Sequence, residues 1–246
     1  MISKNKLKEL AAYRLQKRCD EEAVFVVEGP KMANEAMASG FVVRVVCATA
    51  EWLDSHPDFG GLQAECHELS EAELERLSNF KTPNQVWMLV ERADLKDIKD
   101  TTSLTLALDK IQDPGNLGTI LRTADWFGIR RVVCSHDTVN CYNPKVVQSS
   151  MGAIFRTRVE YTDLPKWLAE CRMPVYGASL QGKPITSMGG SIPQKVVLLI
   201  GNESRGISPE AMAHVSHPVL IPNLGGTAES LNAAVAAGIL MNWMTK

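Results

Sequence analysis

The strongest constraint on the fold is a regular alternation of short apolar runs and helical stretches from residue 104 to the C-terminus. Runs that predict strands occupy residues 104–108, 131–134, 174–178, 196–200 and 219–221, and helices are predicted at 117–127, 144–150, 164–171, 209–214 and 229–244. Strands that alternate with helices form mostly parallel sheets covered on both faces. We therefore predict an α/β domain at 104–246 whose ligand binds beyond the carboxyl ends of the strands.

Residues 1–98 predict a separate, small α/β domain. Strands are expected at residues 23–27, 42–46 and 86–90, and helices at 30–39 and 70–77. Pro30 suits the first turn of a helix, and Gly40 ends that helix. The polar, charged stretch 92–102 is typical of a connection between domains.

Composition narrows the class of protein. Hydrophobic residues make up 45% and charged residues 22%, which is ordinary for a soluble globular protein. The N-terminus has no signal-peptide core, and no apolar run approaches the roughly 18 residues that span a bilayer. We expect a cytoplasmic protein without membrane contact. The six cysteines are scattered, so neither a disulfide framework nor a metal site is expected.

The net charge of −2 is not typical of a nucleic-acid-binding protein, but its distribution is uneven. Within residues 1–18 a single acidic residue, Glu9, accompanies six basic ones, namely Lys4, Lys6, Lys8, Arg14, Lys17 and Arg18. Two interpretations stay open. A solvated helix is the more common meaning of such a cluster, and a patch that contacts phosphates is the more specific one.

The first of three unusual loops follows the predicted strand 104–108. Asp113-Pro114-Gly115-Asn116 predicts a turn into a helix, with Asn116 at the N-cap and Arg122 in the first two turns. A capping Asn and a surface Arg explain this loop as well as a functional site does. The sequence has neither a Gly-x-Gly-x-x-Gly fingerprint nor a Walker lysine, which disfavours a small-molecule nucleotide-binding protein.

The second loop follows the predicted strand 196–200 and holds Gly201, Glu203 and Gly206. Glycines permit a close backbone approach or a positive φ. Glu203 could cap a helix, but Ser208 is the better N-cap for the helix that follows. We therefore favour a functional carboxylate over a structural one.

The third loop begins at Ile221-Pro222, contains Gly225-Gly226 and leads into an Ala-rich C-terminal helix. Ser230 and Asn232 lie near the free backbone N–H groups of that helix start. Capping therefore explains both residues as well as substrate binding does.

Together and in this order, the three loops resemble the motifs of the SpoU (TrmH) branch of the SPOUT methyltransferases. The resemblance covers essentially all of residues 104–246. It rests on Asp113-Pro114, Asn116-Leu117-Gly118, Arg122, Asn143-Pro144-Lys145, Ser150-Met151-Gly152-Ala153, Gly201, Glu203, Gly206, Ile221-Pro222 and Ser230-Leu231-Asn232. Asn223 stands where Met is common, and we expect no loss of activity from it. Residues 1–98 more weakly resemble the ribosomal-protein-like substrate-binding domain of members that act on ribosomal RNA, through Val26-Val27-Glu28-Gly29.

The resemblance implies 2′-O-methylation of a ribose in RNA, with 23S ribosomal RNA favoured, and S-adenosylmethionine as the methyl donor. It implies a C-terminal trefoil knot and a homodimer whose active site borrows residues from both subunits. The implied cofactor-binding residues are Ser179, Leu180, Gly201, Ile221 and Leu231. The implied catalytic residues are Asn116, Arg122, Glu203, Ser230 and Asn232.

Methyl transfer to a ribose oxygen requires that the oxygen be aligned and lose its proton. The family scheme assigns the base to Arg122, but a guanidinium with a pKa above about 12 stays protonated in proteins. We expect instead that Arg122 clamps a phosphate beside the ribose and stabilises the developing alkoxide. Asn116 and Glu203 would orient Arg122 and the sugar, while Ser230 and Asn232 hold the loop and the substrate.

Two other functions stay open. The substrate is a tRNA in other members of the family. A relative that kept the fold and lost catalysis would be an RNA-binding or ribosome-assembly protein. The presence of all five candidate catalytic residues argues against the second alternative, because a non-catalytic protein has no need of them.

Overall fold

The computed structural model describes residues 2–57, 63–82, 84–93, 104–188, 193 and 195–245. The chain divides into two compact units. The first comprises Met1–Asp94 and Tyr142–Phe155, and the second comprises Leu95–Cys141 and Arg156–Lys246. The predicted domain boundary, between residues 98 and 104, lies outside the described residues.

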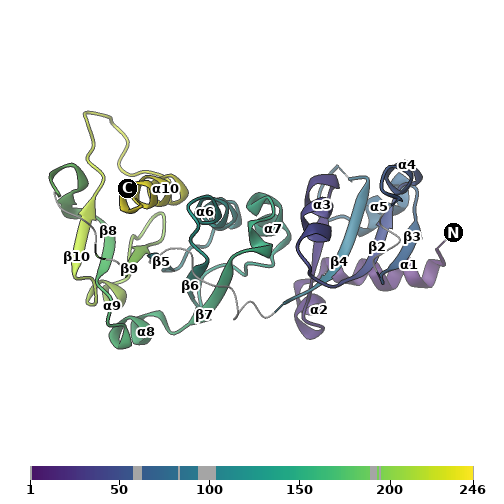
Figure 1. The fold of residues 1–246 in the computed structure, drawn as a ribbon, viewed down its shortest axis with the longest axis horizontal. Coiled ribbons are helices and arrows are strands. Elements are labelled where there is room, and N and C mark those ends of the chain that lie inside the picture. Colours follow the sequence, from purple (N-terminus) through teal and green to yellow (C-terminus); the bar gives the residue numbers. More distant parts are fainter. Residues whose placement is uncertain are drawn as a thin grey trace. The chain divides into compact units, whose positions relative to one another are not determined.

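The first unit is built on a four-stranded sheet in the order β1-β4-β2-β3 (Figure 1). β4 pairs antiparallel with β1 and β2, and β3 is parallel to β2. The bounds are β1 Val24–Glu28, β2 Val43–Ala48, β3 Glu65–Glu68 and β4 Val86–Glu91. The sequence predicted β1, β2 and β4. It missed β3, whose four residues are polar and mostly exposed, so that they carry no apolar pattern.

Helices cover both faces of this sheet. They are α1 Lys4–Ala11, α2 Gln16–Glu21, α3 Pro30–Ala38, α4 Ala50–Asp54 and α5 Glu71–Leu77, with a 3-10 turn at Ala12–Arg14. The side chains of Leu7 and Leu10 on α1 join a core with Leu74, Leu77 and Trp87. α3 begins with Pro30 after Gly29, whose φ of 91° favours glycine, and α5 begins with a Ser70–Glu73 capping box.

The segment Tyr142–Phe155 belongs to the packing of the first unit. It contains α7 (Pro144–Ser150) and a 3-10 turn at Ala153–Phe155. The ring of Phe25 on β1 lies 4.9 Å from that of Tyr142 and 5.8 Å from that of Phe155, measured between centroids. Phe155 also meets Phe41 edge to face at 5.1 Å. An aromatic cluster thus holds this segment to β1.

The second unit contains a parallel six-stranded sheet in the order β10-β8-β9-β5-β6-β7. The strands are β5 Leu104–Leu108, β6 Arg131–Ser135, β7 Arg158–Thr162, β8 Val175–Pro184, β9 Val196–Ile200 and β10 His217–Leu220. Five of the six correspond to predicted strands. β7 was missed because all five of its residues are only partly buried, so that it lacks the apolar run of its neighbours.

Helices cover both faces of the parallel sheet, with α6 and α10 on one face and α8 and α9 on the other (Figure 1). The bounds are α6 Pro114–Trp126, α8 Leu164–Glu170, α9 Pro209–Met212 and α10 Ala233–Met244, and a 3-10 turn spans Ile185–Ser187. Leu164, Leu168 and Ala211 join Val175, Val197 and Leu199 in one core beneath the sheet. The predicted parallel α/β fold is therefore confirmed.

Candidate active site at the carboxyl edge of the parallel sheet

The loops that follow β5 and β9 are bound to each other at their bases. The Asp109 side chain is 1% exposed and accepts a hydrogen bond at 2.7 Å from the backbone N–H of Ser208. Asn202 Nδ2 donates to the backbone oxygen of Lys110 at 2.9 Å. Lys110 adopts φ 57°, a conformation that non-glycine residues rarely hold without surrounding support. These contacts give the two loops a fixed relative position.

A chain of three side chains then joins all three loops. Asn232 Nδ2 donates to Asn116 Oδ1 at 2.8 Å. Asn116 Nδ2 donates in turn to Glu203 Oε1 at 2.6 Å. The structure therefore brings three of the five predicted catalytic residues into direct contact at the edge of the sheet where parallel strands end.

The direction of this hydrogen-bonded chain is set at the start of α10. Asn232 is the N-cap of that helix, and its Oδ1 accepts from the backbone N–H groups of Ala234 at 2.9 Å and Val235 at 3.3 Å. Only the amide Nδ2 of Asn232 remains to face Asn116, which must accept with Oδ1 and donate with Nδ2. The Asn116 amide is thus oriented to donate to the Glu203 side chain, whose Oε1 is held as an acceptor.

Gly201 is required by the shape of the second loop. Residues 202 and 206 form an antiparallel bridge through paired backbone hydrogen bonds of 2.9 Å. A Cβ on Gly201 would lie 2.2 Å from backbone atoms of Gly206 and Ile207, which are not free to move aside. Gly206 has open space around it but adopts φ 69°, so glycine is favoured there by the backbone conformation and not by a lack of space. The tight hairpin leaves the Glu203 side chain partly exposed at its tip.

Arg122 does not join the hydrogen-bonded chain. It lies on α6 six residues after Asn116, which at about 100° per residue places the two side chains roughly a third of a turn apart. The Arg122 side chain is exposed, and within the described part of the chain no hydrogen bond or ion pair engages it. In one copy of the protein, therefore, Arg122 faces solvent.

The third loop exposes most of its side chains. Ser230 is exposed and makes no hydrogen bond to any described residue. Ile221 directly follows β10 and is partly buried, whereas Leu231 is 45% exposed. The Asn223 side chain organises the loop, because Oδ1 accepts from the N–H groups of Gly225 at 2.9 Å and Gly226 at 2.7 Å. A methionine could not make these contacts.

Ser179 and Leu180 lie in an irregular stretch of β8. Pairing of β8 with β9 ends at Gly177, and pairing with β10 jumps from Gly177–Pro218 to Lys183–Val219. Residues 178–182 therefore bulge out of the ladder, and Leu180 is 72% exposed. The two residues follow the last pair with β9, although the strand itself continues to Pro184.

Two local predictions about helix starts were wrong. Asp113, not Asn116, is the N-cap of α6, and it accepts from the backbone N–H of Asn116 at 2.8 Å. Pro114 suits the first helical position, which moves the cap three residues upstream and leaves the Asn116 side chain free for Glu203. The C-terminal helix begins at Ala233 rather than residue 229, because Asn232 supplies the cap.

Sequence reasoning missed Asp109, Asn202 and Asn223, which hold the loops rather than contact one another. Their shared signal is a polar residue directly after, or within three residues of, the end of a predicted strand. The sequence analysis also missed Tyr161 on β7, which likewise holds a loop in place. Its Oη donates to Val139 O and accepts from Cys141 N, both at 2.7 Å, which fixes the loop after β6. Burial raises the pKa of Tyr161 far above its ordinary value near 10.

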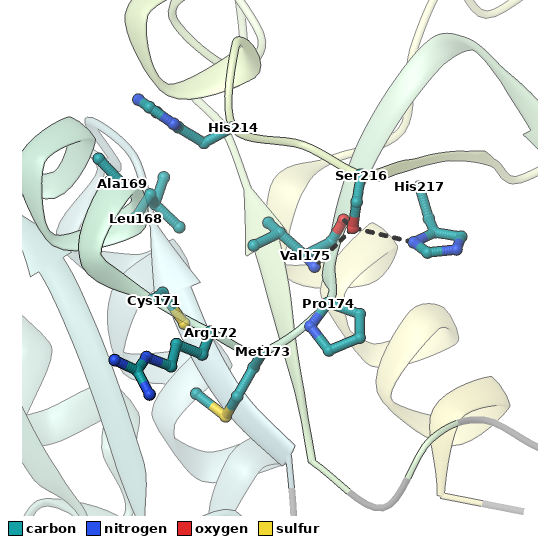
Figure 2. Close-up of a pocket in the computed structure, with 10 residues that line it drawn as sticks. All are labelled: Leu168, Ala169, Cys171, Arg172, Met173, Pro174, Val175, His214, Ser216 and His217. Carbon is teal, nitrogen blue, oxygen red and sulfur yellow. Dashed lines mark hydrogen bonds between the residues drawn. The ribbon is translucent and has the colours of Figure 1, made fainter.

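A hollow of about 470 Å³ lies at the opposite, amino-terminal edge of the same sheet, before β8 and β10. Figure 2 shows that its polar side chains, Arg172, His214 and His217, point in different directions and do not converge on one point. Ser216 Oγ is engaged by the backbone N–H of Val175 at 2.9 Å. This hollow therefore lacks the convergent polar groups of a small-molecule site.

All six cysteines are free thiols, and burial raises the pKa of Cys47 to about 12 and that of Cys19 to about 11. Within the described ranges, no group of three or more His, Cys, Asp or Glu side chains is arranged to hold a metal ion. Nor does any helix in those ranges have the length and apolarity to cross a membrane.

Comparison with known proteins identifies both parts of the chain. Residues 103–242 match the SpoU rRNA Methylase family, and residues 4–87 match the MRM3-like substrate binding domain. The chain is 32% identical over 240 residues to the 23S rRNA (guanosine(2553)-2′-O)-methyltransferase RlmP of Bacillus subtilis, with 96% of this chain and 94% of that relative covered.

Solved structures resemble this chain over nearly its whole length. A TrmH-family protein from Porphyromonas gingivalis is 38% identical with a TM-score of 0.83, covering 99% of this chain and 98% of that one. An AdoMet-bound rRNA methyltransferase from Sinorhizobium meliloti is 25% identical with a TM-score of 0.84, covering 99% and 95%. By the family match over most of its length and by these relatives, the protein is a member of the SpoU rRNA methylase family.

Proposed function

We propose that this protein uses S-adenosylmethionine to methylate the 2′-oxygen of a ribose in 23S ribosomal RNA. The observation that carries the proposal is the hydrogen-bonded chain from Asn232 through Asn116 to Glu203, which unites three motif loops at one edge of the sheet. Support for the substrate comes from the relative in Bacillus subtilis, which is named for this reaction on 23S rRNA.

The loops at this edge suit an adenosine-containing cofactor. Gly201 follows β9 in a tight hairpin, and Leu180 in the bulge of β8 and Leu231 in the loop after β10 expose apolar side chains. An apolar surface with backbone polar groups fits an adenine ring. We assign cofactor binding to Ser179, Leu180, Gly201, Ile221 and Leu231. When bound, S-adenosylmethionine supplies a methyl group already activated on a sulfonium sulfur.

The chain's own residues then align the ribose and stabilise the negative charge that develops on its 2′-oxygen. Asn116 is fixed as a donor to Glu203, so a partly exposed carboxylate with a set orientation is available to the 2′-hydroxyl proton. We assign positioning roles to Asn116 and Asn232. Ser230, whose hydroxyl is exposed, is assigned to the substrate.

Arg122 is assigned to a phosphate next to the target ribose. Its exposed guanidinium can form a bidentate contact with a phosphate, which a lysine cannot reproduce. To test this, we would measure methyl transfer by Arg122→Lys and Arg122→Gln from pH 6 to pH 10. The expected result is a loss of at least about tenfold for Lys at every pH, and a larger loss for Gln. Near-full activity of Arg122→Lys would reject the clamp.

We further propose that the enzyme is a homodimer in which Arg122 of one copy serves the Glu203 of the other. Within one chain Arg122 is exposed and forms no hydrogen bond or ion pair with the Asn116–Glu203 pair or with any other described residue, which leaves its guanidinium available to a second copy. The packed helices α6 and α10 also expose apolar side chains, with Trp126 85%, Val235 51% and Ile239 37% exposed. Such a surface is typical of a subunit interface.

Subunit mixing tests this arrangement. We would co-express Arg122→Ala and Glu203→Ala chains, each inactive alone, and assay the mixture. If Arg122 acts across the interface, each mixed dimer has one intact site, and random pairing restores roughly a quarter of wild-type activity. If both residues act within one chain, every site carries a defect and activity stays at the level of the single variants.

We assign residues 1–98 to a substrate-binding domain and residues 104–246 to the methyltransferase domain, in agreement with the extents of the two matched families. The trefoil knot stays a prediction. A cytoplasmic location is proposed because bacterial relatives act on ribosomal RNA.

The substrate is tested with RNA from cells that lack the gene. Purified 23S rRNA, 16S rRNA and total tRNA would each be incubated with the enzyme and tritiated S-adenosylmethionine. We expect label only in 23S rRNA, at a ribose. Label in tRNA alone would favour the tRNA alternative. Failure to bind S-adenosylmethionine in calorimetry would favour a non-catalytic RNA-binding protein.

A further inference from the structure

The N-terminal segment α1–α2 separates its six cations into two groups. Lys6 and Arg18 are engaged within the domain. Lys6 Nζ lies 2.9 Å from Glu65 Oε2 and 3.3 Å from Glu9 Oε1. Arg18 pairs with Glu22 and lies over the ring of Tyr13. The other four, Lys4, Lys8, Arg14 and Lys17, are exposed, and among the described residues no acid pairs with them. We call these four residues the basic face.

The basic face is held on a rigid support. Leu7 is 6% exposed and Leu10 is 1% exposed, because the opposite side of α1 packs into the core of the first unit. Lys4 and Lys8, one turn apart, therefore share the outer side of a docked helix. Arg14 lies in the 3-10 turn that follows α1, and Lys17 lies in α2, so both are close to α1 in the sequence.

The acids nearest in sequence are already engaged, so they do not neutralise the basic face. Glu9 pairs with Lys6. Asp20 accepts from Gln16 Nε2 at 2.9 Å and pairs with Arg92. Residues 1–100 as a whole carry more acidic than basic side chains, so the positive charge of residues 4–18 is a local excess.

These features identify the kind of partner. A membrane-surface helix needs an exposed apolar side, but Leu7 and Leu10 are buried, which excludes that use of α1. Four unpaired Lys and Arg side chains on one short segment fit repeated negative charges, as along a nucleic-acid backbone. Along α1, Lys4 and Lys8 are separated by a rise of about 6 Å, and Arg14 and Lys17 add two positive charges on the turn and the helix that follow.

We propose that Lys4, Lys8, Arg14 and Lys17 bind the RNA substrate through its backbone phosphates and hold it without reading its sequence. The proposal rests on the proposed function for the presence of an RNA substrate. Of the two interpretations of the N-terminal basic cluster, the proposal chooses the patch that contacts phosphates. Leu15, which is 67% exposed between Arg14 and Lys17, adds an apolar contact on the same segment.

The test is the salt dependence of RNA binding by Lys4→Gln/Lys8→Gln/Arg14→Gln/Lys17→Gln. The matched control is Arg76→Gln/Lys166→Gln/Arg172→Gln/Lys195→Gln, which removes four exposed cations that no described acid pairs with. Full-length transcribed 23S rRNA is the probe, and binding is measured from 50 to 200 mM KCl. Four lost phosphate contacts reduce the slope of log K against log salt by roughly 3. Over this range the wild-type affinity then falls about 50-fold more than that of the variant.

Kinetics supply a second readout. We expect the KM for RNA to rise at least about tenfold in the basic-face variant at 150 mM KCl, with kcat and the Kd for S-adenosylmethionine near wild type. An unchanged salt slope and KM in a folded variant would overturn the proposal while wild-type methylation upholds the enzyme function. If the wild type does not methylate any RNA, the enzyme function fails, and the salt slope alone decides the basic face. Should the fourfold variant unfold, the pairs Lys4→Gln/Lys8→Gln and Arg14→Gln/Lys17→Gln replace it, each with an expected slope change of about 1.5.

Discussion

Asn116 donates a hydrogen bond to Glu203 at 2.6 Å, although the two residues lie 87 positions apart in the sequence. The contact does not arise within one secondary-structure element, because Asn116 lies on α6 and Glu203 lies in the loop after β9. Asp109, Asn202 and Asn232 hold the loops that carry them. The geometry of the carboxylate is therefore a property of three loops together.

The charge of Glu203 can be separated from its contact with Asn116. Glu203→Gln keeps a carbonyl oxygen that can accept from Asn116 but removes the negative charge, whereas Glu203→Ala removes both. We expect kcat to fall about 100-fold in Glu203→Gln with little change in Tm, because the transition state loses a preorganised charge. Glu203→Ala should lose both activity and stability. Wild-type kcat in Glu203→Gln would show that Glu203 is only a structural acceptor.

Asn232 combines a helix cap with a donor to Asn116, and two substitutions distinguish these roles. Asn232→Asp keeps an oxygen for the N–H groups of Ala234 and Val235 but cannot donate to Asn116 while ionised. We expect near wild-type stability and reduced kcat. Asn232→Ala should also lose about 1 kcal/mol of unfolding free energy with the cap. Differential scanning calorimetry and single-turnover assays measure the two effects. Equal kcat in Asn232→Asp and wild type would contradict the donor role.

Gly201 and Gly206 offer a matched pair of alanine substitutions. Gly201→Ala places a methyl group 2.2 Å from backbone, so we expect a loss of at least about 2 kcal/mol and weaker binding of S-adenosylmethionine. Gly206→Ala meets open space and has only the cost of a positive φ, about 1 kcal/mol. Urea unfolding and calorimetric titration give both quantities. A smaller loss for Gly201→Ala than for Gly206→Ala would contradict the close approach.

Tyr161 should contribute stability that depends on alkaline pH. Burial raises its pKa in the folded protein, so its contribution is complete below pH 10 and declines as pH rises and the unfolded chain ionises. At pH 8, Tyr161→Phe should cost about 1–2 kcal/mol through the lost contacts with Val139 and Cys141. Between pH 8 and pH 11 the difference between wild type and variant should shrink by about 1.4 kcal/mol. A constant difference would show that Tyr161 ionises equally in both states.

The sequence predicted the parallel sheet because its central strands are continuous apolar runs; β5 and β9 have every residue buried. The same criterion missed β7, a partly exposed edge strand on which Glu160 forms ion pairs with Arg158 and with Arg131 of the neighbouring β6. Polarity at an edge strand is decided by what lies beside it in space, and the local sequence does not contain that information.

The sequence indicated candidate site residues one by one, but it did not indicate the hydrogen bonds that connect Asn232, Asn116 and Glu203. Asn116 was expected to cap α6, and Pro114 shifted the cap to Asp113. That displacement of one turn is what frees Asn116 to reach Glu203. The contact between Asn116 and Glu203 could not be read from motif order, because it depends on where α6 lies against the loop that follows β9.

The aromatic cluster around Phe25 has a practical consequence for anyone who shortens the chain. A fragment that stops near residue 93 would leave Phe25 and Phe41 without Tyr142 and Phe155, which come from much later in the chain. A fragment that starts near residue 104 would carry the complementary rings uncovered. Each truncated fragment is thus expected to expose apolar surface and to aggregate, so the protein is best expressed as the full chain.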